Sequence, residues 1–513
     1  MSTPTKPSVS PTSDPTLSSS PKPSSAIASD TATSAGRGAI YITLAKFYFI
    51  FTGYAIIFTL PRLLTKEQYG EYVVVTSFVS IINAVIITGT QQAVSKFVSE
   101  NPAAAEGLRS RALGVQGILG TITVLAYVLL TPYLATQFWN DASLITPLRV
   151  SALITLCYAF YAVYMGYLNG KKEFFWQATL DSSYSTFKML AIIACALVFR
   201  SVTGAVGGFA LGAFLVLILA IGLAGRGRST IAPHIELGTY LTFQLPLLAF
   251  VLCNNLLQKV DIAFLKAFSS ADPTIASANA GDYGALINIA NITYQAVISV
   301  TFVVFPLISK ASFEKETGEV QTYIRQTMRV ALLVMALLAT VFSSNAADSL
   351  GLLYPKIYLT GAGALQIVAF GMLSFGLISV LTTIITGSGH PWISLLIGAF
   401  TLAANVVLNY KLIPIYGLRG AAMGTTISMT VGALLACGYV LFSFKALISP
   451  LTLGRIVLAS VLIYGLHLIP LTGVLVVVKM TIQGLAYLTI LIITRELGAQ
   501  ELRLIQKIFR LTK

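Results

Sequence analysis

The sequence has few of the residues that carry chemistry in soluble enzymes. Its 513 residues include three histidines, four cysteines and 19 acidic residues. The histidines are far apart and form no metal-binding motif, and the cysteines lie in apolar runs without paired spacing. No glycine-rich phosphate-binding loop is present, and no two carboxylates are spaced for acid–base work. We therefore expect no metal, no cofactor and no enzymatic activity.

Charge is also scarce, whereas apolar residues are abundant. Charged residues make up 10% of the chain and hydrophobic residues 56%, and soluble domains have about 25% charged residues. A membrane-spanning helix uses about 20 mostly apolar residues, so the apolar content suffices for roughly fourteen spans. This composition excludes a soluble enzyme and a nucleic-acid-binding protein. It predicts an all-α polytopic membrane protein.

The N-terminal segment has a different composition. Serine, threonine and proline account for 23 of residues 1–38. Such a segment buries too little apolar surface to offset the entropy lost on ordering, so it predicts a disordered cytoplasmic tail. It has no apolar stretch typical of a secretory signal. A single arginine, together with Asp14 and Asp30, argues against an organellar transit peptide.

Long apolar runs begin at residue 39 and alternate with short polar stretches. The predicted spans cover residues 39–60, 72–91, 112–131, 147–168, 174–198, 203–224, 239–265, 283–307, 326–343, 361–386, 392–410, 418–443, 453–470 and 473–494. Because fourteen is even, both termini lie on the same side of the membrane. With both termini in the cytoplasm, 21 lysines and arginines lie on the inner side and eight on the outer side. This bias fits the positive-inside rule and predicts cytoplasmic termini.

The last segment, residues 495–513, is basic and amphipathic. Leu502, Ile505 and Phe509 recur at helical spacing, and Arg503 and Lys507 lie on another face. This pattern predicts a helix on the anionic lipids of the cytoplasmic leaflet. A solvated helix end after the last span is the alternative.

An internal repeat divides the spans into two sets. When the chain is aligned with itself, Tyr69-Gly70 matches Tyr283-Gly284, and each pair opens a span. Six spans separate the copies, so both copies have the same orientation. The repeat predicts two parallel-related six-helix lobes, followed by two C-terminal helices. The predicted parts are an N-lobe over 39–224, a cytoplasmic linker over 225–238, a C-lobe over 239–443 and the two last spans within 444–494.

A second part of the repeat consists of small residues. Gly208 and Gly212 near the start of the sixth span align with Gly420 and Gly424 near the start of the twelfth. We interpret these Gly-x-x-x-Gly pairs as packing devices that let helices approach closely, and not as binding elements.

Several sequence stretches resemble a known transporter family. After the first span the chain reads Leu60-Pro-Arg-Leu-Leu-Thr-Lys-Glu-Gln-Tyr-Gly-Glu-Tyr72, and the next span ends Gln91-Gln92-Ala-Val-Ser-Lys-Phe-Val-Ser-Glu100. Further stretches are Gln258-Lys-Val-Asp-Ile262 and Gly417-Leu-Arg-Gly-Ala-Ala-Met-Gly424. The order of these stretches along the chain, from about residue 40 to the end, resembles that of the oligosaccharide flippases. These are the O-antigen and polysaccharide translocases of the multidrug/oligosaccharidyl-lipid/polysaccharide exporter superfamily.

The resemblance implies a function and a substrate. A member of that family is expected to move an undecaprenyl-pyrophosphate-linked oligosaccharide from the inner to the outer leaflet of a bacterial plasma membrane. A monomer is expected, and an association with glycan polymerase machinery stays open. The long Ser/Thr/Pro tail departs from the family pattern, in which the chain begins close to the first span.

Charged residues within spans are the candidates for function, because they are costly there and usually face a cavity or a partner. The candidate substrate-binding residues are Lys46, Arg62, Lys188 and Lys259. Their cationic groups would neutralise a pyrophosphate. Lys479, outside the repeated core, is expected to snorkel towards the membrane surface. For each of them, a structural ion pair is the alternative.

Two carboxylates within spans are candidates for ion coupling. Asp181 or Asp261 could bind Na⁺ or a proton, or the membrane potential could act directly on a charged substrate. Because Lys259 and Asp261 are two residues apart, at most one of them faces the cavity. In the same span, Pro246 with Asn254 and Asn255 predicts a bent cavity helix, and a plain packing kink is the alternative.

Three other functions are compatible with a polytopic membrane protein. A cation-coupled efflux pump of the same superfamily would favour acidic over basic cavity residues. A membrane glycosyltransferase or polymerase needs a catalytic loop outside the membrane, and the polar gaps here are short. A non-transporting scaffold would share the fold.

Overall fold

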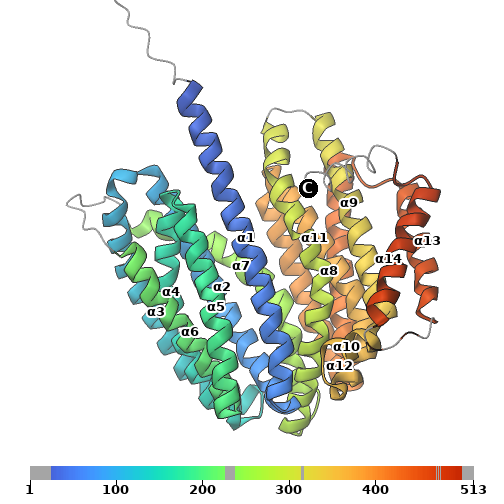
Figure 1. Ribbon diagram of the computed structural model, residues 1–513, viewed down its shortest axis with the longest axis horizontal. Coiled ribbons are helices and arrows are strands. Elements are labelled where there is room, and N and C mark those ends of the chain that lie inside the picture. The colour runs from blue at the N-terminus through green and yellow to red at the C-terminus, as the bar shows by residue number, and fades with distance from the viewer. Residues whose placement is uncertain are drawn as a thin grey trace, which may run out of the picture.

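The computed structural model describes residues 25–225, 237–313, 317–468, 471, 473 and 475–498. Side chains are described from residue 41 onward, except for 237–250 and a few positions between 299 and 317. All regular structure in these ranges is helical (Figure 1). The all-α prediction is therefore confirmed.

Fourteen α-helices follow one another along the described chain. They are α1 (Ser25–Leu63), α2 (Lys66–Glu100), α3 (Ala105–Tyr133), α4 (Ile145–Gly170), α5 (Phe174–Phe199), α6 (Val202–Ala224), α7 (Leu237–Phe268), α8 (Pro273–Phe313), α9 (Thr317–Ser344), α10 (Ala346–Leu353), α11 (Ala362–Gly387), α12 (Pro391–Phe444), α13 (Pro450–Gly465) and α14 (Leu475–Ile493). Short 3₁₀ or π turns lie at Pro102–Ala104, Leu134–Phe138, Ala142–Leu144, Lys356–Gly361 (η4) and Leu466–Leu468.

These helices supply the predicted fourteen spans. Among the described residues, eleven helices are long and apolar enough to cross a membrane. One of them, α12, has 54 residues and a break at Gly417 with φ 55° and ψ −126°. It therefore consists of two antiparallel spans. The helices α7 and α8, of 32 and 41 residues, complete the set, and the eight-residue α10 is too short to span.

The first helix begins earlier than the sequence predicted. It starts at Ser25, so residues 25–38 are helical and not disordered. This stretch contains alanine at four positions, and alanine has the highest helix propensity of all residues. Residues 1–24, the predicted linker from 226 to 236 and the predicted basic helix from 499 onward lie outside the described residues.

The helices form two lobes that share a core at one end only. We call the end of the bundle where α1 begins and α14 ends the terminal side, and the opposite end the far side. One large apolar cluster contains residues of α2, α4, α7, α8 and α11 in the far half of the bundle. In the terminal half, one cluster contains only N-lobe residues and another only C-lobe residues. The lobes accordingly converge at one end and diverge at the other (Figure 1).

The Gly-x-x-x-Gly pairs pack helices closely, as predicted. A Cβ atom on Gly208 would overlap the carbonyl oxygen of Ala191, and one on Gly212 would lie 2.9 Å from the Cα of Lys188. These contacts join α6 to α5. In the C-lobe, a Cβ on Gly420 would overlap the carbonyl oxygen of Leu412, across the break in α12. Small residues thus hold both helix pairs together.

Ion pairs connect the two C-terminal spans to α9 and α10. Lys479 Nζ in α14 lies 2.6 Å from Asp348 Oδ2 in α10, and Lys479 is 3% exposed. The prediction that Lys479 snorkels is therefore wrong, because a carboxylate within reach neutralises it inside the protein. Close to the end of α14, the Glu496 carboxylate accepts hydrogen bonds from Arg329 of α9 and Arg455 of α13.

Candidate functional site: a cationic cavity between the lobes

A cavity of about 250 Å³ lies where the two lobes meet. Its walls come from α1 and α2, from Lys188 of α5 and Phe209 of α6, and from α7 and α8. The polar residues that line it are Tyr69, Tyr72, Thr76, Ser77, Ser80, Lys188, Lys259 and Asn288. Among the described residues that line this cavity, none is acidic. The cavity is therefore positively charged.

The two lysines come from opposite lobes. Lys188 reaches the cavity from α5, and its Nζ lies 4.4 Å from the ring centroid of Phe209 and 5.8 Å from that of Tyr184. Aromatic faces stabilise an ammonium without neutralising it. Lys259 reaches the cavity from α7, and it forms no ion pair with any residue in the described ranges. Within the described ranges neither ammonium is thus held in an ion pair, and Asp261 is close enough to Lys259 for its charge to act on it.

The other two predicted substrate-binding residues lie outside the cavity lining. Lys46 of α1 is exposed, and its Nζ lies 3.4 Å from Asp181 Oδ2 of α5. Arg62 is at the far end of α1, where it is exposed and donates to the carbonyl oxygen of Phe58. Lys46 and Asp181 therefore form the structural ion pair that was the alternative interpretation.

Asp261 lies inside the C-lobe and not in the cavity. It is 1% exposed, and its Oδ2 accepts hydrogen bonds from Tyr283 at 2.8 Å and from Thr425 at 3.3 Å. Its Oδ1 accepts from the backbone N–H of Ile262 at 2.8 Å. Lys259, two residues earlier, lines the cavity. This agrees with the prediction that at most one of the two faces it.

Asn254 and Asn255, which lie nearer the start of α7, do not line the cavity. Asn255 is half-buried and donates to the carbonyl oxygen of Val251 in its own helix, at 2.9 Å. Asn254 is half-buried, and its carbonyl oxygen accepts from Gln258 at 3.5 Å. Pro246 lies within α7, and its side chain is outside the described residues.

A smaller cavity of about 160 Å³ continues the first one between α1 and α8. The two cavities share Phe49, Gly53, Ile57 and Asn288. One hydrogen bond crosses the smaller cavity, from Gln295 Nε2 of α8 to the Tyr54 hydroxyl of α1 at 3.3 Å. Sequence reasoning missed these residues, although amides recur along α8 at helical spacing and pointed to a polar face.

The lobes are joined on the far side by two ion pairs. Lys66 of α2 lies 2.8 Å from Asp282 of α8, and Lys266 of α7 lies 2.6 Å from Asp141, which precedes α4. The Lys266 side chain is fully buried. Burial pushes the pKa of Asp141 upwards, but the hydrogen bonds from Lys266 and Ser143 outweigh it and hold the pKa below its ordinary value.

Close backbone contact reinforces this closure. A Cβ on Gly70 of α2 would overlap the carbonyl oxygen of Ser277 in α8. The Trp139 indole N–H also crosses between lobes and donates to the carbonyl oxygen of Ala263 at 3.2 Å. These contacts close the cavity on the far side. On the terminal side, the apolar clusters of the described residues each belong to one lobe, so no shared core covers the cavity there.

The described residues contain no group of three or more His, Cys, Asp and Glu side chains that could hold a metal ion. The geometry is that of a membrane transporter: two lobes, a polar cavity between them and closure at one end. The chain belongs to the polysaccharide biosynthesis protein family, whose sequence profile matches residues 35–312, more than half of the chain.

Similar structures share this fold. The lipid II flippase MurJ in an inward closed conformation superposes with a TM-score of 0.71 at 16% identity, over 90% of this chain and 99% of that one. An inward-facing multidrug resistance MATE family transporter of the MOP superfamily gives a TM-score of 0.63 at 14% identity, over 77% and 94%. The chain therefore has the same fold as this flippase and this transporter.

Curated relatives match a shorter stretch. An uncharacterised membrane protein of Methanocaldococcus jannaschii is 30% identical over 136 residues, which is 26% of this chain and 27% of that protein. A probable flippase, AglR of Haloferax volcanii, is 28% identical over 138 residues, or 26% and 28% of the two chains. The chain thus matches little more than a quarter of the length of these relatives.

Proposed function

We propose that this protein is a flippase for a lipid-pyrophosphate-linked oligosaccharide. It moves this substrate from the inner to the outer leaflet of the plasma membrane by alternating access, for the biosynthesis of a polysaccharide such as an O-antigen. In a bacterium the lipid is undecaprenyl. The observation that carries the proposal is a cavity with two lysines from opposite lobes and no acidic residue in its described lining.

The charge of the cavity fits a pyrophosphate. Lys188 and Lys259 supply two ammonium groups, and each can neutralise one phosphate as a point charge with three donors. Hydroxyls of Thr76 and Ser80 and the amide of Asn288 supply neutral hydrogen-bonding groups for the rest of the headgroup. Because the lysines come from different lobes, an anion bound between them contacts both moving parts.

The shape of the cavity fits a lipid-linked substrate. Its extension between α1 and α8 is lined mainly by apolar residues, among them Phe49, Ile50 and Ile57. A polyprenyl chain can leave the cavity towards the lipid there, while the charged headgroup stays between the lobes. One hydrogen bond, between Tyr54 and Gln295, has to open for this passage.

The direction of transport follows from the orientation. The positive-inside bias favours a cytoplasmic terminal side and the inner membrane as the location. The far-side ion pairs then close the cavity towards the outside, and a substrate enters from the inner leaflet. Rearrangement of the lobes around the bound headgroup opens the far side and releases it to the outer leaflet.

Asp261 is the candidate for ion coupling. Its carboxylate is buried beside Thr425 and Tyr283, so binding of Na⁺ or a proton there alters the packing of α7 against α8 and α12. The membrane potential is the alternative driving force, at about 2.3 kcal/mol per charge per 100 mV. Asp261→Asn should abolish the dependence of transport on an ion gradient if this carboxylate couples. If the potential alone drives transport, the variant should transport as the wild type does.

Complementation of a flippase-deficient strain tests the proposal. We expect Lys188→Ala and Lys259→Ala to lose complementation at unchanged protein level, and the matching Lys→Arg variants to retain part of it because they keep the charge. Lys411→Ala is the control, since that lysine is exposed on α12 and outside the cavity lining. Full activity of the double Lys188→Ala, Lys259→Ala variant would contradict pyrophosphate binding.

Efflux of a drug or metabolite is the second candidate, favoured by the shared fold with MATE family transporters. An efflux pump for cationic compounds calls for carboxylates in the cavity, and the described lining here has none. Drug susceptibility of cells that express the protein separates the two. Resistance that depends on Lys188 and Lys259, without complementation of a flippase defect, would favour efflux.

A further inference from the structure

The two lobes differ at one equivalent place on the terminal side. In each lobe, the start of one helix lies near the ends of three others. In the N-lobe the start of α3 lies near the ends of α2, α4 and α6. In the C-lobe the start of α9 lies near the ends of α8, α11 and α12. These positions are related by the internal repeat. The N-lobe fills this place with a side chain, and the C-lobe leaves it open.

Arg109 fills the place in the N-lobe. It is the fifth residue of α3 and is 5% exposed. Its guanidinium donates to the carbonyl oxygens of Ala224 and Gly225 at the end of α6, and it lies 5.0 Å from the ring centroid of Tyr167. The last carbonyls of a helix have no partner within the helix. Arg109 supplies such a partner and a positive charge at the negative end of the helix dipole.

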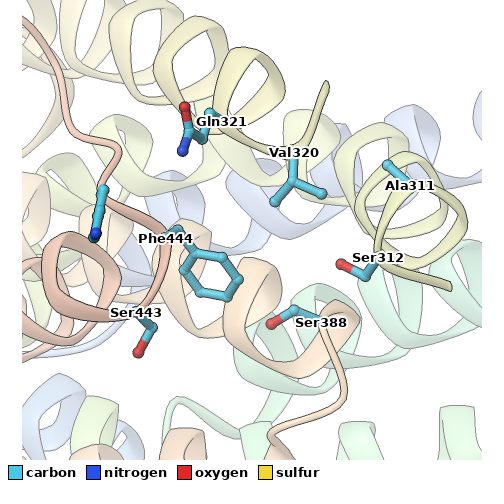
Figure 2. Close-up of a pocket in the computed structure, with 8 residues that line it drawn as sticks. Ala311, Ser312, Val320, Gln321, Ser388, Ser443 and Phe444 are labelled. Atoms are coloured by element: carbon cyan, nitrogen blue, oxygen red, sulfur yellow. The ribbon is translucent and has the colours of Figure 1, made fainter. Parts of the chain in front are cut away.

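Gln321 occupies the corresponding position in the C-lobe. It is the fifth residue of α9, and it aligns with Arg109 in the same register that aligns Gly420 with Gly208. Instead of a guanidinium, a cavity of about 640 Å³ lies here. Figure 2 shows Gln321 and Val320 of α9 on one wall, Ser443 and Phe444 of α12 opposite them, and Ser312 of α8 on a third side.

The walls of this cavity carry groups of both polarities. The N–H of Lys445 donates to the carbonyl oxygen of Leu441 at 3.0 Å, and within the described chain no donor reaches the carbonyls of residues 442–444. This end of α12 therefore accepts a cationic donor, as α6 does from Arg109. The Lys445 ammonium and the hydroxyl of Ser312 offer donors to an anion on the other walls, whereas the Ser388 hydroxyl donates to the carbonyl oxygen of Ile385 at 2.9 Å.

Two exposed phenylalanine rings flank the cavity. Phe313, the last residue of α8, is 89% exposed, and Phe442 of α12 is 87% exposed. Each lies next to a residue that lines the cavity. Contact with water is unfavourable for a phenylalanine ring, and an apolar environment is favourable. The two rings therefore offer an exposed apolar surface beside the polar cavity, a combination that suits a lipid with a polar headgroup and apolar chains.

We propose that this C-lobe cavity binds the headgroup of a membrane phospholipid that carries a primary ammonium next to its phosphate. The ammonium lies at the end of α12, where the N-lobe has the Arg109 guanidinium. The phosphate lies against Lys445 and the Ser312 hydroxyl, and the acyl chains run along Phe313 and Phe442. The site is separate from the cavity between the lobes and shares no lining residue with it in the described chain.

Lipid selectivity of the unaltered protein tests the proposal first. Native mass spectrometry of the detergent-purified protein is used to titrate phosphatidylethanolamine, phosphatidylglycerol and phosphatidylcholine with identical acyl chains. We expect one phosphatidylethanolamine to bind about tenfold more tightly than the other two, because only it combines a hydrogen-bonding ammonium with a phosphate. Equal binding of the three lipids, or a preference for phosphatidylglycerol, would overturn the proposal.

A substitution that copies the N-lobe tests the position. Gln321→Arg places a guanidinium where Arg109 stands in the other lobe, so it should fill the cavity and weaken phosphatidylethanolamine binding by about tenfold. Gln326→Arg is the control, because Gln326 is an exposed glutamine on the same helix, away from the lining. Unchanged binding in Gln321→Arg, or equal loss in both variants, would place the lipid elsewhere.

A second variant keeps the test informative if Gln321→Arg fails to fold. Lys445→Gln removes the charge opposite the phosphate from an exposed position, and it leaves the cavity unfilled. It should weaken phosphatidylethanolamine binding severalfold and leave complementation of a flippase defect unchanged. Wild-type affinity in this variant would contradict the proposed contact with the phosphate.

Discussion

Lys66 of α2 and Asp282 of α8 form an ion pair of 2.8 Å that joins the two lobes on the far side of the bundle. The Asp282 side chain is 3% exposed, and Thr360 also donates to its Oδ2 at 2.7 Å. Breaking a buried pair by removing one partner costs about 3–5 kcal/mol, because the other charge stays buried without compensation. The loss destabilises the state in which the far side is closed, because the pair is formed in that state.

We therefore predict that Asp282→Asn shifts the protein towards a far-open state. Spin labels at Arg149→Cys in the N-lobe and Lys411→Cys in the C-lobe, in a variant without the four native cysteines, report the separation of the lobes on that side. Asp282→Asn should add a population at longer distance. The charge-swapped double variant Lys66→Glu, Asp282→Lys should reduce it again, and an unchanged distance distribution in Asp282→Asn would argue against a gate at this pair.

Gly70 of α2 packs so closely on α8 that a Cβ atom at this position would overlap the Ser277 carbonyl oxygen. Gly70→Ala forces the helices apart, and overpacking of this kind costs about 1–3 kcal/mol or more. We expect a lower thermal unfolding midpoint. Gly114→Ala in α3 is the control, because no atom lies within 4 Å of its Cβ position. That variant should be neutral or stabilised by up to about 1 kcal/mol.

The Asp141–Lys266 pair predicts a pH dependence. The pKa of Asp141 is held below its ordinary value in the folded protein, so the pair contributes stability at neutral pH, and this contribution is lost as the pH falls through the folded pKa. We expect the thermal unfolding midpoint of Asp141→Asn to lie well below that of the wild type at pH 7, because Lys266 is left buried without a counter-ion. The gap should begin to narrow below about pH 4, the ordinary pKa of an aspartate, and should close once the pH has fallen below the lowered pKa of Asp141, where protonation in the wild type removes the same charge. A gap that stays constant across the acidic range would contradict this assignment.

The sequence was sufficient to predict spans, lobes and helix packing, because these depend on residue type and period. The apolar runs and the alignment of Gly208 with Gly420 are visible in the chain itself, and the structure confirms both the fourteen spans and the close approach at these glycines. The identity of two cavity lysines was also predictable, since a lysine in the middle of a span is costly unless it faces a cavity or a partner.

The partners of charged residues were not predictable from the sequence. Lys46 pairs with Asp181 and Lys66 with Asp282, and both partners are so distant along the chain that no local spacing indicates either pair. Asp181 is closer in sequence to Lys188, on roughly the same helical face, yet Lys188 lies over Phe209 on the neighbouring helix. Such choices depend on how helices rotate against one another, which hydrophobic periodicity determines only coarsely.

The Lys479–Asp348 pair allows the two C-terminal spans to be tested separately from the lobes. Lys479 is 3% exposed and Asp348 lies 2.6 Å away in α10. Asp348→Ala leaves the ammonium unpaired, and we expect a loss of about 3 kcal/mol, the lower end of the range for a broken buried pair. Lys479→Met with Asp348→Ala removes both charges and should recover most of that loss, because an apolar pair of similar volume packs about as well. The double-mutant cycle is measured by thermal unfolding in detergent. Losses that simply add would show that the two side chains do not interact, and that α14 is attached to the C-lobe by its other contacts.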